Sequence, residues 1–120
     1  MADNTFFTTE IYQTEIALDT NQYVLQRIYK DNISANDKLS IEFFYVTDKA
    51  EKAERLKNHL EREFPGYSQF KVQPYKKMYE ILGTTDSIQM DLQVINKWNQ
   101  VMWDIGYTFD CKLDGWQVGI

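Results

Sequence analysis

Apolar and polar residues alternate over residues 39–46, LSIEFFYV, so that every second side chain lies on the same side of an extended backbone. This alternation, with its β-branched and aromatic residues, predicts a strand. Residues 48–64 instead repeat their apolar side chains every three or four positions, and a Pro-Gly pair follows them. That spacing predicts an amphipathic helix, which we expect to begin at a capping box of Asp48 and Glu51.

The same two patterns return in the second half of the chain. Residues 67–73 and 77–82 predict two strands that are joined by a turn near Pro74. Residues 107–113, YTFDCKL, alternate between apolar and polar side chains and predict a final strand.

A second helix is predicted between these strands, over residues 84–106. We expect Asp86 to be its N-cap, Gln89 to occupy the matching capping-box position and Gly106 to end it. Trp103 departs from the apolar stripe of this helix, because its helical neighbours are mostly Asn and Gln. Two interpretations stay open for Trp103: a half-exposed contact for a partner, or an indole that the N-terminal segment covers.

The order of elements predicts the fold class. Residues 1–38 show helical i,i+4 pairs and end in a polar connector, and the core of residues 39–120 then reads strand, helix, strand, strand, helix, strand. This order is typical of an α+β, ferredoxin-like domain, in which both helices lie on one face of an antiparallel four-stranded sheet. We expect one domain over residues 1–120, with the N-terminal helical segment covering the other sheet face.

Composition and charge narrow the class of partner. The chain has 120 residues, of which 43% are hydrophobic and 15% aromatic, enough to build one core. Its net charge of −5 argues against direct binding of nucleic acid or an anionic membrane and is compatible with a protein partner. A single cysteine, no apolar run of membrane-spanning length and no cationic leader predict a cytoplasmic protein.

No group of residues predicts catalysis, a metal site or a cofactor. His59 is the only histidine and lies on the charged flank of the first helix, where we expect a boundary position. Cys111 lies among apolar residues of the final strand, where we expect an inert, buried thiol.

The segment LDGW, residues 113–116, follows a Gly-terminated helix and an aromatic-rich strand. This arrangement, with LSIEFFYVTDKAEKAERLKNHL at residues 39–60, resembles the RraB family of regulators of ribonuclease E over about residues 39–118. Asp114, Gly115 and Trp116 match the family's motif, whereas Gln117 stands where the family usually has another Gly. The resemblance implies a ferredoxin-like fold and a regulatory, protein-binding role without catalysis or cofactor, the partner being a ribonuclease.

Three functions stay open at this stage. The first is the non-enzymatic regulator, with Asp114, Gly115, Trp116 and Trp103 as candidate interaction residues. The second is a dimeric α/β-barrel enzyme or small-molecule binder, and the third is an acidic immunity-type protein that blocks a toxin. A covered sheet face favours the regulator over the barrel, whereas a pocket with converging Tyr, Trp or His side chains favours the barrel. The oligomeric state is left open.

For Trp116 itself, the structural interpretation is that Asp114-Gly115 turns the chain and the indole folds over the sheet edge, with its N–H bonded nearby. A direct contact with a partner is the alternative.

Overall fold

The computed structural model describes residues 4–119, so the outermost ends of the predicted domain lie outside it. The elements in chain order are α1 (Thr9–Thr14), the 3-10 turn η1 (Leu18–Thr20), α2 (Asn21–Tyr29), β1 (Lys38–Thr47), α3 (Ala50–Glu63), β2 (Ser68–Tyr75), β3 (Met78–Gln89), α4 (Leu92–Thr108) and β4 (Lys112–Gln117). The predicted α+β class is confirmed, with N-terminal helices before a β-α-β-β-α-β core.

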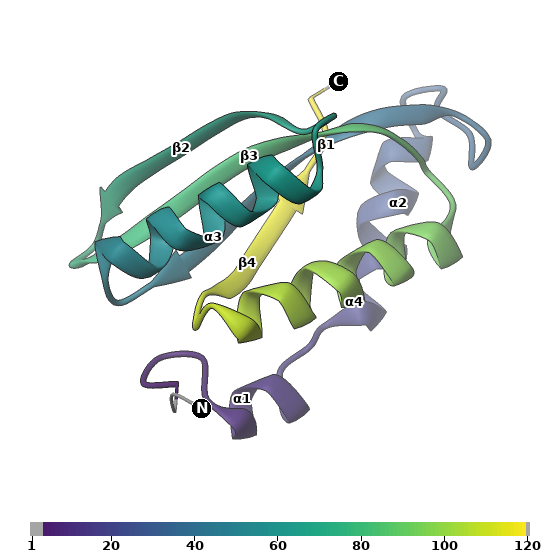
Figure 1. Cartoon of the computed structure of the whole chain (residues 1–120). Coiled ribbons are helices and arrows are strands. Elements are labelled where there is room, and N and C mark those ends of the chain that lie inside the picture. Colours follow the sequence, from purple (N-terminus) through teal and green to yellow (C-terminus); the bar gives the residue numbers. More distant parts are fainter. Residues whose placement is uncertain (1–3, 120) are drawn as a thin grey trace.

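The four strands form one antiparallel sheet in the order β2-β3-β1-β4. α3 and α4 lie side by side on one face of this sheet (Figure 1). The alternation predicted for the first strand holds, because Ile41, Phe43 and Tyr45 of β1 are fully buried against the helices. The hydrophobic core therefore lies between the sheet and this helix layer.

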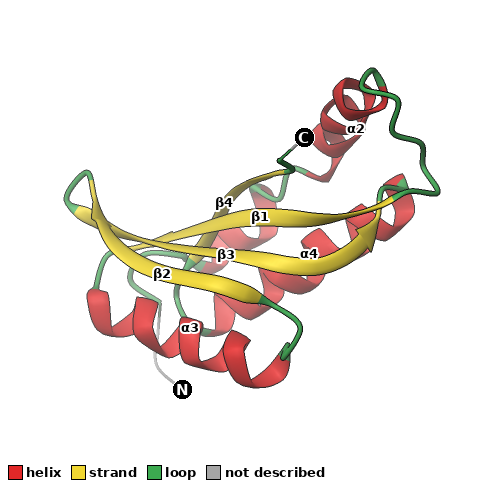
Figure 2. Ribbon diagram, turned by 90° about the horizontal axis from the view of Figure 1, so that it is seen from above, coloured by secondary structure: helices red, strands yellow, loops and turns green. Residues whose placement is uncertain are grey.

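The opposite sheet face is not covered by the N-terminal segment, so that expectation was wrong. Figure 2 looks onto this face and shows the helices behind the sheet. The N-terminal segment packs instead against α4, where the ring of Phe7 lies 4.6 Å from that of Trp103 and 5.5 Å from that of Tyr107. The segment packs there because the outer side of α4 offers large aromatic rings. On the open sheet face, by contrast, Phe44 and Leu82 lie among polar neighbours.

The end of α4 differs from the prediction. The helix passes Gly106 and ends at Thr108, so the predicted strand over 107–113 was wrong in its first half, and β4 begins only at Lys112. The amide of Cys111 donates to the carbonyl of Gly106 at 2.9 Å, and Asp110 adopts a left-handed φ of 58°. This is a Schellman ending with Asp in the position that Gly usually takes.

Gly106 is needed for a close approach rather than for ending the helix. A Cβ atom at this position would overlap the backbone oxygen of Cys111 and press on the ring of Tyr45. Only glycine lets the returning chain pass so near the last turn of α4.

Both predicted capping boxes were also wrong. β3 continues to Gln89, so Asp86 and Gln89 lie in a strand, and Asp91 caps α4 by accepting from the amides of Gln93 and Val94. The N-cap of α3 is Lys49, with no side-chain hydrogen bond, while Asp48 forms an ion pair with Lys52 at 2.9 Å. Asp91, which caps α4, was not predicted, and Asp48 was recognised before α3 but pairs with Lys52 instead of capping the helix.

The β2–β3 turn lies two residues after Pro74, which itself pairs with Tyr79 within the sheet. Lys76 and Lys77 form the turn with φ values of 48° and 66°. Two consecutive left-handed residues are typical of the tight turns whose twist matches that of a hairpin.

Candidate functional site: a groove beside the last strand

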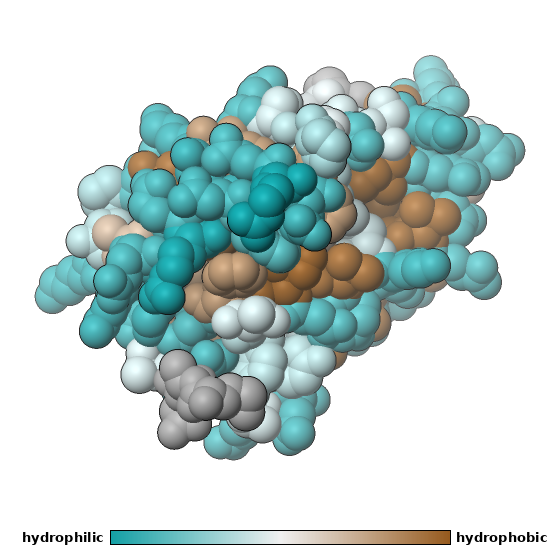
Figure 3. Space-filling view, in the orientation of Figure 1, coloured by the Kyte–Doolittle hydropathy of each residue, from teal (hydrophilic) through white to brown (hydrophobic). Residues whose placement is uncertain are grey.

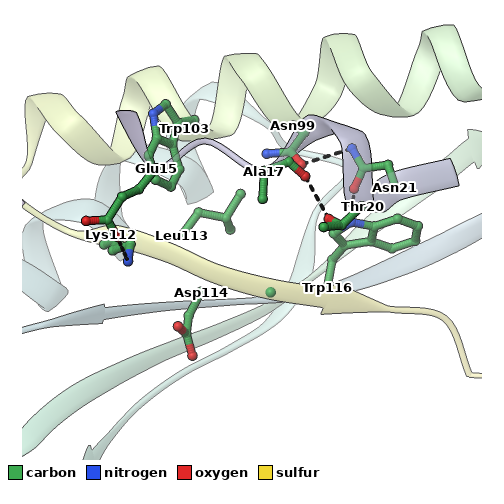
Figure 4. Close-up of a pocket in the computed structure, with 11 residues that line it drawn as sticks. Glu15, Ala17, Thr20, Asn21, Asn99, Trp103, Lys112, Leu113, Asp114 and Trp116 are labelled. Carbon is green, nitrogen blue, oxygen red and sulfur yellow. Dashed lines mark hydrogen bonds and ion pairs between the residues drawn. The ribbon is translucent and has the colours of Figure 1, made fainter. Parts of the chain in front are cut away.

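A groove of about 250 Å³ runs between β4, α4 and the segment that joins α1 to α2. All four residues that the sequence singled out line it: Trp103 from α4, and Asp114, Gly115 and Trp116 from β4. Figure 4 shows β4 along one side of the groove and the N-terminal segment with α4 along the other. Residues that are about 100 positions apart in the sequence thus build one surface feature.

Trp116 has the structural role that was predicted for it. Its indole is partly buried and meets the ring of Trp98 edge-on at 6.4 Å. The indole N–H donates to Oδ1 of Asn21 at 2.9 Å, and Asn21 is only 1% exposed. The Nδ2 of Asn21 in turn donates to Asn96 and Asn99 of α4 at 2.9 and 3.1 Å. This network fixes the end of β4 to both α2 and α4.

Trp103 is covered by the N-terminal segment and is 3% exposed. Its indole N–H donates to the backbone oxygen of Tyr12 at 3.0 Å, and Phe7 packs on its ring. The covering interpretation is therefore confirmed, and Trp103 lines the groove although it is almost fully buried.

Asp114 and Gly115 do not form a turn, contrary to the structural interpretation of LDGW. They lie within β4, where Tyr45 pairs with Leu113 and Phe44 with Gly115, so Asp114 is the extra residue of a β-bulge. In Figure 4 the carboxylate of Asp114 points away from the other groove residues, and its side chain is exposed. A Cβ at Gly115 would come within 3.0 Å of the ring of Phe44, which explains the small residue there.

The groove has polar ends. Glu15 and Lys112 form an ion pair of 3.0 Å at one end, and Trp116 with Asn21 closes the other (Figure 4). Ala17 and Leu113 supply apolar lining between them. Such a site offers an aromatic ring, a short apolar floor and charged rims to a bound chain.

A buried ionic cluster that the sequence did not reveal joins Asp110, just after α4, to Lys52 of α3. The carboxylate of Asp110 is 6% exposed and pairs with Lys52 at 2.5 Å. It also accepts the backbone N–H groups of Thr5, Phe6 and Phe7, at 2.9, 3.1 and 2.5 Å. Asp110 therefore holds the start of the N-terminal segment on the core.

These contacts set the charge states of the cluster. Burial pushes the pKa of Asp110 upward, but the ion pair with Lys52 and the backbone N–H bonds outweigh it and leave this pKa below 3.8. Burial lowers the pKa of Lys52, yet the two carboxylates of Asp110 and Asp48 more than compensate and raise it above 10.5. All three groups are charged at neutral pH.

The predictions for His59 and Cys111 are confirmed. His59 is half-buried at the edge of α3, where its ring lies 4.8 Å from that of Phe109. Cys111 is fully buried, and burial raises its pKa to about 12, so the thiol stays protonated.

The described residues form neither a metal site nor a membrane-spanning helix. Within residues 4–119, no three or more His, Cys, Asp or Glu side chains gather closely enough to hold a metal ion. No helix of that range is both long and apolar enough to cross a membrane.

On the helix side of the molecule, apolar side chains gather on the surface along α4, beside the polar surface of α3 (Figure 3). Leu92, Val94 and Val101 of α4 are 37, 37 and 40% exposed.

Comparison with known families identifies one match. The model of the RraB family, Regulator of ribonuclease activity B, matches residues 18–118. This range holds α2, α3, α4 and the whole sheet, and it confirms the resemblance that residues 39–118 suggested. A search of curated proteins finds no match.

Proposed function

We propose, because the chain belongs to the RraB family, that it binds ribonuclease E and changes the rate at which this enzyme cleaves RNA. Members of the family are non-enzymatic regulators of ribonuclease E, which confirms that the chain is not an enzyme. Family membership is the observation that carries the proposal.

Membership also favours the regulator over the other two functions that the sequence left open. The open sheet face carries a shallow depression lined by Phe44, Leu82 and polar side chains, with no Tyr, Trp or His among its lining residues. That depression therefore lacks the converging groups expected of a dimeric barrel enzyme. An immunity-type role has no observation in its favour beyond the acidic charge, which the regulator shares.

The charge of the chain supports an electrostatic contribution to this binding. A ribonuclease presents basic surfaces to the phosphates of its substrate. A chain of net charge −5 complements such surfaces, and screening by salt weakens that attraction. We expect the affinity for ribonuclease E to fall as ionic strength rises.

The test is direct binding between the purified chain and purified ribonuclease E, measured by calorimetry at low and at high salt. A saturable complex that weakens with salt supports the proposal. The proposal is contradicted if mixing the two proteins gives no heat of binding at protein concentrations well above the dissociation constants of typical regulatory complexes. An unrelated folded protein of similar size and net charge serves as a control for non-specific binding by an acidic polypeptide.

A further inference from the structure

β4 is an edge strand whose outer side has no strand beside it. The sheet order places β4 next to β1 alone. Among the described residues, the backbone of Lys112–Gln117 forms its ladder with β1 and makes no other backbone–backbone hydrogen bond. The outward N–H and C=O groups of β4 are therefore available to another extended chain.

The groove described above runs along this free edge. β4 contributes five consecutive lining residues, Lys112 to Trp116, and the opposite wall comes from the N-terminal segment and α4. An extended chain that pairs with β4 would place alternate side chains into the groove, against the indole of Trp116 and the side chains of Ala17 and Leu113. The edge thus provides backbone pairing and side-chain recognition in one place.

The other edge of the sheet is protected against such pairing. β2 contains Pro74, which has no N–H to donate, and its register shifts between Ser68 and Lys71 at a bulge. Exposed lysines follow in the adjoining turn at Lys76 and Lys77. Proline, bulges and lysines are the usual means of blocking an edge strand.

The charge around the groove selects the kind of chain that would bind. Glu15 lines the groove, Asp19 lies in η1 between the lining residues Ala17 and Thr20, and Asp114 belongs to the edge strand itself, with an exposed carboxylate that points away from the other groove residues. Lys112 is the only basic lining residue, and Glu15 already pairs with it. A second copy of this chain would bring the same acidic groups together, whereas a Lys- or Arg-containing segment is attracted.

We propose that an extended, basic segment of ribonuclease E adds to β4 as a fifth strand and places its side chains in the groove. This inference rests on the proposed function, because it names the surface by which the regulator holds its enzyme. A basic side chain of the segment can lie over the indole of Trp116, where a cation is attracted to the ring face.

Hydrogen–deuterium exchange of the chain, alone and with purified ribonuclease E, tests this mode of binding. We expect the amides of residues 112–117 to exchange at least tenfold more slowly in the complex. Those of β2, residues 68–75, should be unchanged and serve as the internal control, because that edge stays free.

Substitutions at two exposed positions test the groove, and a third substitution elsewhere is the matched control. Asp114→Lys reverses the charge at the edge, and Ala17→Lys places a long cationic side chain in the groove. We expect each to weaken binding to ribonuclease E at least tenfold. Glu54→Lys on the exposed side of α3 changes the net charge by the same amount as Asp114→Lys and should bind within twofold of the parent.

The outcomes separate this inference from the proposed function. Binding without slower exchange in β4, or with equal effects of Asp114→Lys and Glu54→Lys, overturns the edge assignment and leaves the regulator intact. No binding by the parent chain overturns both. Slower exchange in β4 that depends on the concentration of the chain alone, without ribonuclease E, identifies a second copy as the occupant and also overturns the inference.

Discussion

Replacing Asp110 with Asn should separate the N-terminal segment from the core at a large cost in stability. Asn has nearly the same shape and tolerates the left-handed φ of 58° at this position, so the substitution removes mainly the charge. It breaks the ion pair with Lys52 and weakens three backbone N–H bonds. Hydrogen bonds to charged groups contribute about 1.5–3 kcal/mol each, and loss of one partner of a buried pair costs about 3–5 kcal/mol.

Because the Asn amide oxygen can still accept some of these N–H groups, we expect the free energy of unfolding to fall by about 2–4 kcal/mol at neutral pH. For a urea m-value of about 2 kcal/mol/M, the unfolding midpoint falls by about 1–2 M. Asp114→Asn is the matched control, since this exposed carboxylate has no hydrogen bond or ion pair within residues 4–119, and it should change stability by less than about 0.5 kcal/mol.

The pH dependence of the same variant gives a second check. The folded-state pKa of Asp110 lies below its ordinary value of 3.8, so its stabilising effect is complete above that value and disappears as the pH falls through the lower, folded pKa. The difference between parent and Asp110→Asn should therefore shrink below pH 3.8. Equal urea midpoints for Asp110→Asn and Asp114→Asn at neutral pH, or a difference that persists undiminished in strong acid, would refute the reasoning.

Three further substitutions test the packing. Trp116→Ala should lower the free energy of unfolding by about 2–3 kcal/mol and Trp116→Phe by about 1–2 kcal/mol. The reason is that the indole is only partly buried but donates its N–H to the buried oxygen of Asn21. Thermal melts measure both losses, and melts like that of the parent would contradict the network. Gly106→Ala should cost about 1–3 kcal/mol in chemical denaturation despite the better helix propensity of Ala, because the added Cβ displaces the backbone of Cys111; a stabilised variant would contradict this. Cys111, with a pKa of about 12, should resist alkylation at neutral pH until the chain unfolds; rapid labelling of the native chain would show that the thiol is exposed.

The parts of the fold that were predicted correctly depend on local patterns. The alternation at residues 39–46 and the helical spacing at 48–64 reflect burial on one side of each element, and the structure has β1 and α3 there. The element boundaries depend on contacts that sequence spacing does not show. Tyr107, Thr108 and Phe109 alternate as a strand would, yet the last turn of α4 includes the first two because Gly106 lets the chain return closely.

The four residues that the sequence singled out line one groove, but their arrangement there was not predicted. Asp-Gly is a common turn pair, so LDGW suggested a turn, but pairing with β1 keeps it in a strand with a bulge at Asp114. The burial of Trp103 depends on Phe7 and Tyr12, about 90 residues earlier. The role of Asp110 was missed for the same reason, although an acidic residue just after a helix, where Gly is usual, was a signal of a special backbone position.

The most direct test of the central claim is the rate at which purified ribonuclease E cleaves a defined RNA as the chain is added. The account predicts a rate that changes with chain concentration and reaches a plateau, with no cleavage by the chain alone. It also predicts a curve displaced to higher concentration for Asp114→Lys but not for Glu54→Lys. A cleavage rate that stays constant up to a large molar excess of the folded chain would contradict the account.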